Sequence, residues 1–319
     1  MNRRSILKLM VLSPLVYACN DSYNPSDSNY ASPLEVREIT TDTVLTENTI
    51  GVQYNVHPNV TLDCTSVVLD GRVGSNMTAV IFAHPNSTIL NPTVINARTG
   101  VSVVPNDHKV VWNQLENLSK ADGLALVNAS RNSGGQLITG GDFMGCRVAI
   151  YVHALNVGAR IEDNKFNSNR LSIYLDAYSQ QTTVDNNRFC DQGKGWKDKV
   201  LGWFAAGRES IAVDGSSNNI IINNDFQRST RKAFIEIYKN CGENNIPRWE
   251  GSLDNEITDN SFEDGSIGVW VSSRRDDRGT PPCRPDDEGD IVINTALSNN
   301  TFSNVTADIR DHGTNTVIA

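Results

Sequence analysis

A short phrase that ends in phenylalanine recurs along the chain and constrains its fold more than any other feature. Its copies end at Phe143, Phe166, Phe189, Phe226, Phe262 and Phe302. The first two steps are 23 residues long, and the next three are 37, 36 and 40 residues long. A unit of 23 residues is too short for a pair of helices but fits one coil of a β-solenoid, and the longer steps indicate inserts. The sequence therefore predicts an all-β repeat fold.

Strand patterns follow the phrases. Segments such as VAIYVH, AFIEIYK and SIGVWV alternate in the way that strands with one buried face do. Aligned on the preceding phenylalanine, the strands predict buried side chains at Ile150, Val152, Ile173, Leu175, Ile211, Val213, Ile235, Ile237, Val269 and Val271. The residues between them must point outward. One outward row contains Tyr151, Tyr174, Ala212, Glu236 and Trp270, and a second contains His153, Asp176, Asp214, Tyr238 and Ser272.

Asparagine suits the tight corner before most of these phenylalanines. It tolerates left-handed backbone angles, and stacked copies can hydrogen-bond along the axis. Through DNKF, DNNRF, NNDF, DNSF, NNTF and VVLDGRVG, the chain resembles the right-handed parallel β-helix proteins of the pectate-lyase-like group. The resemblance covers roughly Thr46 to Val317 and implies one such β-helix with loop inserts on one side. That fold serves lyases, hydrolases, epimerases, phage spikes and non-catalytic surface proteins, so it does not select a function.

The first 18 residues have the pattern of an export signal. A basic start is followed by a short apolar run, which is broken by Pro14 and is too short for a permanent membrane helix. The ending VYAC resembles a bacterial lipobox, which implies that Cys19 is lipidated. NRRSILK resembles a twin-arginine signal, and both this route and the general secretory route remain open. We therefore expect a periplasmic or cell-surface lipoprotein.

The remaining chain divides into two parts. Residues 19–35 are polar and have the composition of a flexible tether, and residues 36–319 form the β-helix domain. Within the domain we expect order to begin near Val36, the first full coil at Thr61–Gly71, and a loop around Asn106–Leu118.

Charge restricts the partners of the exported body. Loss of residues 1–18 removes three basic residues and no acid, which changes the net charge from −9 to −12. A body this acidic has no general attraction for nucleic acid. We expect a monomer that has a polysaccharide and, through its lipid, a membrane as partners. No cofactor is expected; the acids Asp276, Asp277, Asp286, Asp287 and Glu288 could hold calcium, but they lack a recognisable calcium-loop spacing.

Five cysteines remain beside Cys19. Cys241 and Cys283 lie in inserts that leave the same corner of adjacent coils, so we expect them to form a disulfide. Cys146 and Cys190 lie two coils apart, about 9 to 10 Å along the axis, which exceeds the reach of a disulfide. We expect these two to be buried thiols.

The outward rows and the inserts indicate a carbohydrate site. Aromatic rings stack on the apolar faces of sugars, and polar groups bond to the hydroxyls. The predicted substrate-binding residues are Tyr151, His153, Tyr174, Tyr238, Trp270, Arg274 and Arg275. Phe234 is also expected to be exposed, with Trp249 on a neighbouring insert.

Two kinds of catalysis are open at this site. Asp176, Asp214 and Glu236 fall on successive coils, at separations that glycoside hydrolases use for their paired acids. Alternatively, Arg231 or Lys232 is the base of a polysaccharide lyase, which removes the proton alpha to a uronate carboxyl group. The leading hypothesis is an exported polysaccharide-binding protein that is either a lyase, a hydrolase or not an enzyme. The alternative is a non-catalytic spacer or adhesin.

The lipid anchor is directly testable. If Cys19 carries the lipid, then Cys19→Ser should move the protein from the membrane fraction to the soluble fraction, because nothing else in the sequence anchors it. Fractionation followed by immunoblotting measures this. Unchanged membrane association of the variant would contradict the assignment.

Overall fold

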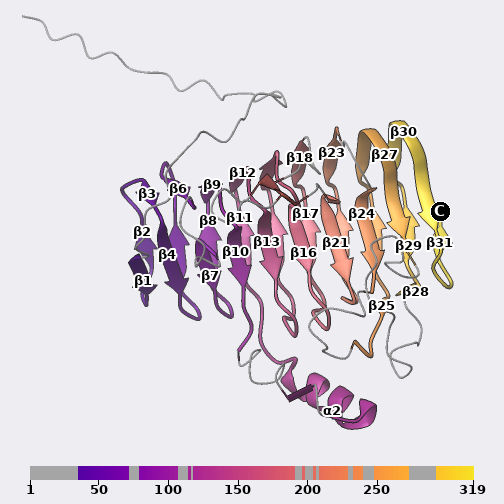
Figure 1. Cartoon of the computed structure of the whole chain (residues 1–319), viewed down its shortest axis with the longest axis horizontal. Helices are drawn as coiled ribbons and strands as arrows, with labels where there is room; N and C mark the ends of the chain where they lie inside the picture. The colour runs from indigo at the N-terminus through magenta and orange to yellow at the C-terminus, as the bar shows by residue number, and fades with distance from the viewer. Residues whose placement is uncertain are drawn as a thin grey trace, which may run out of the picture.

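The computed structural model describes residues 35–71, 79–106, 114–115, 118–190, 208–228, 233–239, 248–272 and 292–319, and the backbone of 196–197 and 204–205. Strands stack along one long axis, and consecutive coils pair in parallel (Figure 1). The predicted parallel β-solenoid is confirmed.

Each complete coil contributes one strand to each of three rows. The front row, which carries the candidate site, contains β1 (Glu35–Ile39), β4 (Val52–Val56), β7 (Ile81–Ala83), β10 (Thr99–Val103), β13 (Val148–Val152), β16 (Ile173–Leu175), β21 (Ile211–Asp214) and β24 (Ala233–Tyr238). The second row contains β2 (Thr43–Val44), β5 (Thr61–Asp63), β8 (Thr88–Leu90), β11 (Leu137–Thr139), β14 (Arg160–Glu162), β17 (Thr183–Asp185), β22 (Ile220–Ile222), β26 (Glu256–Thr258), β29 (Ala296–Ser298) and β31 (Val317–Ile318). The third row contains β3 (Thr49–Ile50), β6 (Val68–Asp70), β9 (Thr93–Ile95), β12 (Asp142–Met144), β15 (Lys165–Asn167), β18 (Arg188–Cys190) and β23 (Asp225–Gln227).

Two long strands join rows without a break. β27 (Ser261–Val271) and β30 (Thr301–Asp311) each begin in the third row and continue into the front row of the next coil. Two small pairs lie beside the stack: β19 (Trp196–Lys197) with β20 (Phe204–Ala205), and β25 (Ser252–Leu253) with β28 (Val292–Ile293).

The core has the register that the sequence predicts. All ten side chains predicted to be buried belong to one continuous apolar cluster inside the coils. Neighbouring coils are paired residue for residue, for example Ile173 with Ile211 and Ile235 with Val269. Because every second side chain of these strands is buried, the side chains between them lie on the outer surface of the front row.

The recurring phenylalanines form a ladder through this core. Phe143, Phe166, Phe189, Phe226, Phe262 and Phe302 occupy one register position on successive coils. Their rings are stacked, with centroids 4.5 to 5.3 Å apart. Offset stacking of this kind adds stability beyond the burial of apolar area.

Before five of the six phenylalanines, all but Phe143, two adjacent polar residues have different roles. The first, such as Asn186 with φ of 52°, has the left-handed backbone conformation of the corner. The second is buried and hydrogen-bonded along the axis: both the backbone N and Nδ2 of Asn187 donate to Oδ1 of Asn224, at 2.9 and 3.0 Å. The same bonds join Asn164 to Asn187 and Asn224 to Asn260. The predicted asparagine ladder is confirmed at this second position.

One expectation about chain order was wrong, and one helix was not predicted. The solenoid begins one coil before Thr61–Gly71, because β1 already pairs with β4. The excursion expected at Asn106–Leu118 is followed by helix α2 (Lys120–Ser130), which lies beside the stack where front-row strands end (Figure 1). Ser119 caps this helix by accepting a hydrogen bond from the Asp122 backbone N at 3.2 Å.

Phe234 and Cys190 also differ from expectation. Phe234 is buried in the core cluster inside the coils, and its ring lies 5.7 Å from the rings of Phe226 and Phe262. Cys190 is disulfide-bonded and is not a free thiol. The predicted pairing of Cys241 with Cys283 lies outside the described residues.

The other two described cysteines behave as buried thiols. Cys64 and Cys146 are buried and free, which confirms the prediction for Cys146. Burial raises the pKa of each thiol to about 12. Both groups therefore remain protonated and unreactive at neutral pH.

The asparagine ladder predicts a position-specific loss of stability. Asn187→Ala should lower the free energy of unfolding by about 2 to 4 kcal/mol, because the buried Asn164 N–H loses its acceptor and the Ile161 carbonyl loses a donor. Asn186→Gly is the matched control: its bond to Asp163 is exposed and glycine accepts the left-handed angle, so the change should stay within about 1 kcal/mol. Urea denaturation measures the free energy of unfolding of both variants. Equal losses would contradict the assignment of the corner conformation to Asn186 and of the axial hydrogen bonds to Asn187.

Candidate functional site

Two outward columns run along the front row. The first contains Ser102, Tyr151, Tyr174, Ala212, Glu236, Trp270 and Arg310, which are paired in register from coil to coil. The second lies two residues further along each strand and contains His153, Asp176, Asp214, Tyr238 and Ser272. Tyr151, Tyr174, Ala212 and Tyr238 pack in an apolar cluster that is separate from the one inside the coils, which confirms the predicted outward direction of these four residues.

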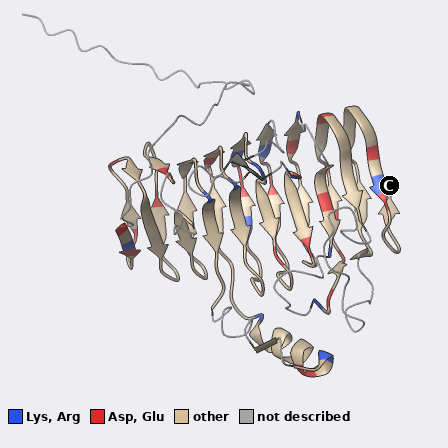
Figure 2. Cartoon of the chain, viewed as in Figure 1, with Lys and Arg blue, Asp and Glu red and all other residues tan. Residues whose placement is uncertain are grey.

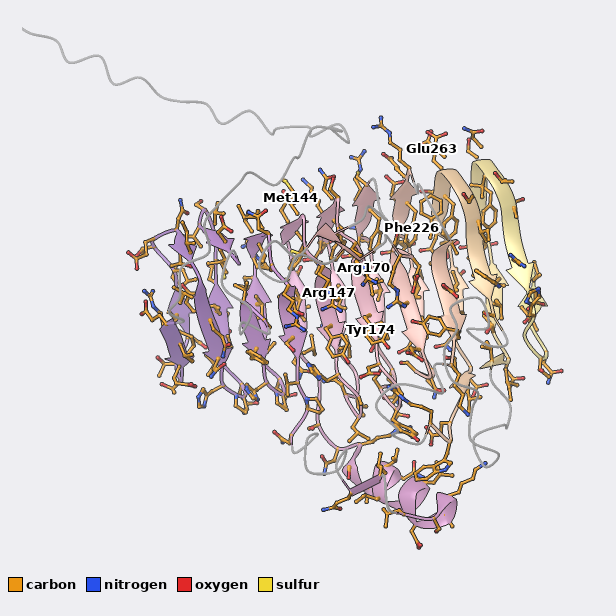
Figure 3. The ribbon with its side chains drawn as sticks, in the orientation of Figure 1. Met144, Arg147, Arg170, Tyr174, Phe226 and Glu263 are labelled. Carbon is orange, nitrogen blue, oxygen red and sulfur yellow. The ribbon has the colours of Figure 1, made fainter. Side chains whose placement is uncertain are left out.

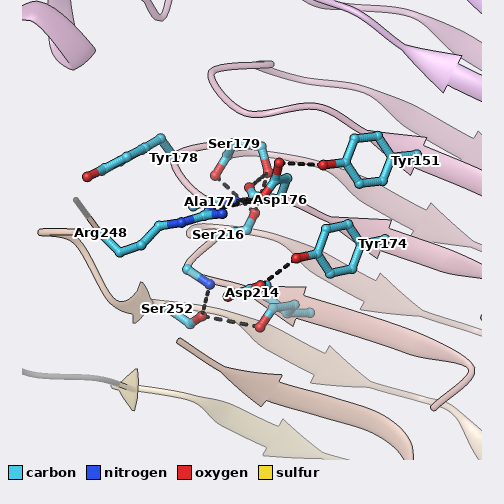
Figure 4. A network of polar contacts seen from close by, with 12 residues as sticks. Tyr151, Tyr174, Asp176, Ala177, Tyr178, Ser179, Asp214, Ser216, Arg248 and Ser252 are labelled. Atoms are coloured by element: carbon cyan, nitrogen blue, oxygen red, sulfur yellow. Dashed lines mark hydrogen bonds and ion pairs between the residues drawn. The ribbon is translucent and has the colours of Figure 1, made fainter. Parts of the chain in front are cut away.

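Tyrosine and aspartate form a repeated diagonal contact between the columns. Tyr151 donates its hydroxyl to Oδ2 of Asp176 on the next coil at 2.6 Å, and Tyr174 does the same to Asp214 at 2.5 Å (Figure 4). The two tyrosine rings stack with centroids 5.1 Å apart. The coils of Tyr151 and Tyr174 thus carry the same tyrosine–aspartate contact, displaced by one strand spacing.

Arg248 joins this network from a distant part of the chain. Its Nη1 donates to Oδ1 of Asp176 at 2.9 Å (Figure 4). Burial alone lowers the pKa of Arg248, but the carboxylates of Asp176 and Asp214 reverse this effect, so the pKa lies above its usual value. The guanidinium is therefore a permanent positive charge between two acids.

The segment that carries Arg248 is held against the turns after the front row. Trp249 packs with Tyr178, Leu155 and Val127 of α2 in a separate apolar cluster. Its backbone N donates to the Tyr178 hydroxyl at 2.9 Å. Arg131 at the end of α2 pairs with Glu250 and donates to the Tyr178 carbonyl at 3.0 Å. Helix α2 thereby packs against the edge of the site. Trp249, which was expected on a surface insert, is buried.

A second arginine contacts the network from the start of the strands. Arg208 donates from Nη2 to the Tyr238 hydroxyl and to Glu209, both at 2.5 Å, and lies 5.7 Å from the centroid of the Tyr174 ring. Burial acts to lower its pKa, but the Glu209 carboxylate and the two tyrosines raise it well above the usual value. Arg208 therefore remains charged.

Burial separates the predicted site residues into two groups. Asp176, Asp214, Glu236 and Tyr238 are 7%, 0%, 1% and 0% exposed, so no ligand can contact them without a rearrangement. Tyr174 is also buried, whereas Tyr151, His153 and Trp270 are partly exposed. His153 lies 2.6 Å from Oγ of Ser102 and edge-on to Tyr151, and the guanidinium of Arg310 covers the Trp270 ring at 4.6 Å. The accessible part of the site is therefore aromatic and hydrogen-bonding, and Asp176 and Asp214 are buried acceptors of the two tyrosine hydroxyls.

Several predicted residues cannot be placed. Arg231, Lys232, Arg274, Arg275 and Cys19 lie outside the described residues. The structure pairs Ala233 with Ile267, so the step from Phe226 to this strand position is two residues longer than the step from Phe262.

The sequence reasoning missed Ser102, Glu209 and Tyr178. Ser102 carried a usable signal, since it precedes Tyr151 in the same register column. Glu209 and Tyr178 lie in turns outside the alternating pattern, so periodicity could not identify them.

Among the described residues, no group of three His, Cys, Asp or Glu side chains is placed to hold a metal ion. Within the same ranges, no helix has the length and apolar character needed to cross a membrane.

The stacked parallel coils and their outward columns define a β-helix protein. A family model described as "Right handed beta helix region" matches residues 78–248, more than half of the chain. The chain belongs to this family, which also confirms the right-handed fold class. A comparison with curated proteins finds no match.

Solved structures share this fold. The enzymatically active domain of bacteriophage CBA120 tailspike protein 2 has a TM-score of 0.50 and 13% identity, over 84% of this chain and 38% of that chain. A GH87 α-1,3-glucanase catalytic domain has a TM-score of 0.44 and 10% identity, over 84% and 50%. The periplasmic alginate epimerase AlgG has a TM-score of 0.41 and 11% identity, over 86% and 76%. At these identities the likeness shows the fold alone, and this chain spans half or less of the first two.

The buried Tyr174–Asp214 pair predicts a change in alkaline stability. Burial, and then Asp214, raise the pKa of Tyr174 well above 10.0, so the folded protein keeps a proton that the unfolded chain loses above about pH 10. The free energy of unfolding should therefore fall as the pH rises past 10. In Tyr174→Phe this fall should be shallower, although the variant is less stable at pH 8 by about 1 to 3 kcal/mol through loss of its hydrogen bond. Urea denaturation at pH 8 and 11 tests this, and parallel pH dependences would refute it.

Proposed function

We propose that this chain is an exported, lipid-anchored β-helix protein that binds a polysaccharide on the outer face of its front row. One observation carries the proposal: partly exposed Tyr151, His153 and Trp270 lie in outward columns of a rigid, flat sheet. Sugar rings stack on such aromatic faces, and Ser102 and His153 supply groups that can bond to hydroxyls.

Rigidity supports this role. Tyr151 is held by the bond to Asp176 and by stacking on Tyr174, so its ring is ordered before any ligand arrives. A ring that is already fixed loses little conformational freedom on binding, which favours affinity. The buried acids therefore contribute by orienting the aromatic surface.

Binding is favoured over cleavage by the same geometry. A glycoside hydrolase needs a carboxylic acid within hydrogen-bond reach of the scissile oxygen. Asp214 and Glu236 are covered, and Asp176 is shared between Tyr151 and Arg248. A lyase role for Arg231 or Lys232 and a spacer or adhesin role for the whole chain remain the competing proposals.

Replacement of the accessible rings tests the binding surface. Tyr151→Ala and Trp270→Ala should each weaken binding to a recognised glycan by about 1 to 3 kcal/mol, because each removes a stacking ring that lies outside the core. Ile220→Ala is the matched control, since it removes a partly exposed apolar side chain from the second row. Affinity electrophoresis against a panel of soluble polysaccharides measures all three.

The same panel separates the competing functions. Absence of binding to every polysaccharide would reject the proposal in favour of a spacer or adhesin. New reducing ends, or ultraviolet absorbance from an unsaturated sugar, would replace it with a hydrolase or a lyase.

A further inference from the structure

Two histidines occupy the second outward column on neighbouring coils near one end of the stack. His57 follows β4 and His84 follows β7, and the pairing of these two strands places the histidines side by side (Figure 1). Backbone hydrogen bonds confirm the alignment: His57 N donates to the Ile39 carbonyl at 2.9 Å, and His84 N donates to the Val56 carbonyl at 3.2 Å. Neighbouring strands are about 4.8 Å apart, so the two side chains leave the sheet next to each other.

The two imidazole rings are near each other and open to solvent. Their centroids are 6.4 Å apart, with an angle of 44° between the ring planes. The side chain of His57 is 45% exposed, and His84 is half-buried. A small ligand can therefore contact both rings without entering the core.

Glu38 on β1 determines which nitrogen of His57 carries the proton. Its Oε2 lies 2.9 Å from Nε2 of His57, and its Oε1 accepts a hydrogen bond from Nδ2 of Asn55 at 2.7 Å. Asn55 is held in turn by Gln53, which donates to its Oδ1 at 3.1 Å. An ionised carboxylate only accepts hydrogen bonds, so Nε2 of His57 is the donor and the neutral ring has its lone pair on Nδ1. A carboxylate in this position is the usual second partner of a metal-bound histidine, which it orients and makes more basic.

The charges of β1 leave negative charge beside the two rings. Acidic and basic residues lie together on this strand (Figure 2). Arg37 pairs with Glu35 at 2.7 Å and with Glu47 at 3.4 Å. Glu38 instead accepts hydrogen bonds from Asn55 and His57. Its carboxylate therefore favours a cation at the histidine pair.

The histidine pair is separate from the proposed polysaccharide surface. Val104 lies between His84 and His153 in the same column. The coils that carry the proposed surface lie further along the stack, where Figure 3 labels Arg147 and Tyr174. An inference about the pair therefore goes beyond the proposed function and does not depend on it.

We propose that His57 and His84 bind one divalent transition-metal ion, such as copper, nickel or zinc, and that Glu38 orients His57 for this purpose. Imidazole nitrogen suits these ions, whereas calcium and magnesium prefer oxygen ligands. Zinc–nitrogen bonds are about 2.0 to 2.1 Å long, so the two side chains rotate toward each other to share one ion. Two protein ligands leave positions for water, and the site is thus distinct from a three-ligand group of the kind that the described residues lack. The bound ion joins the coils of β4 and β7.

Metal titration of the untagged protein tests the site. After removal of metal with EDTA, the protein at pH 7.5 should bind Ni²⁺ and, more tightly, Cu²⁺ in isothermal titration calorimetry. Each ion should raise the midpoint of thermal unfolding, because it binds the folded pair and not the separated histidines of the unfolded chain. Ca²⁺ should do neither.

Three variants assign the ligands. His57→Gln/His84→Gln should remove one equivalent of bound ion and the thermal shift, while leaving the unfolding midpoint in EDTA unchanged. Glu38→Gln should weaken Ni²⁺ binding by about tenfold or more, since it replaces the carboxylate that orients His57. His312→Gln is the matched control: this exposed histidine lies in the same column, but its register neighbour is Ser272, so binding should be unchanged.

Footprinting of the unaltered protein supplies a test that does not depend on the folding of any variant. Diethyl pyrocarbonate modifies imidazole nitrogens, so bound Ni²⁺ should slow the modification of His57 and His84 and leave that of His312 unchanged. Equal rates at His57 and His84 with and without Ni²⁺ would overturn the site, as would full Ni²⁺ binding by the His57→Gln/His84→Gln variant. The same protection by Ca²⁺ would overturn coordination by nitrogen.

Discussion

Everything in this molecule depends on the hydrogen-bonded register between one coil and the next. Because each coil pairs residue for residue with its neighbour, a given side-chain type recurs in a straight column along the axis. The buried phenylalanine and asparagine ladders are two such columns, and they also stabilise the register. A slip of one residue would turn apolar side chains outward and break the hydrogen bonds between the asparagine side chains.

The outer face uses the same geometry for a different purpose. Tyr151 and Tyr174 stack because they share a column, and each reaches an aspartate in the adjacent column of the next coil. Arg98, Arg147, Arg170 and Arg208 form a further column of this kind, at the start of the same strands. Columns of rings and cations, a few ångströms apart along a rigid axis, form a surface whose period is that of the backbone.

Long-range contacts decide which parts of this surface can be reached. Arg248 is separated from Asp176 by 72 residues, and helix α2 packs on Trp249 and Tyr178 from yet another excursion. These segments enclose one end of the outward columns, where Asp214 and Tyr238 are buried. Tyr151 and His153, two coils before Asp214, stay partly exposed. Asp176 and Asp214, two of the acids singled out by position, accept hydrogen bonds from tyrosines in this structure, and Asp176 also pairs with Arg248.

The sequence by itself determined the repeat, the inward ladders and the outward direction of Tyr151, Glu236 and Trp270. It could do so because these properties follow from local periodicity. Successive side chains of a strand point to opposite faces, and the position of the phenylalanine phrase indicates which of them point inward. Burial of Glu236, the inward turn of Phe234, helix α2 and the state of Cys190 were decided only by tertiary structure. Each depends on how excursions of irregular length and distant segments pack on the coils, and no periodic signal encodes that packing.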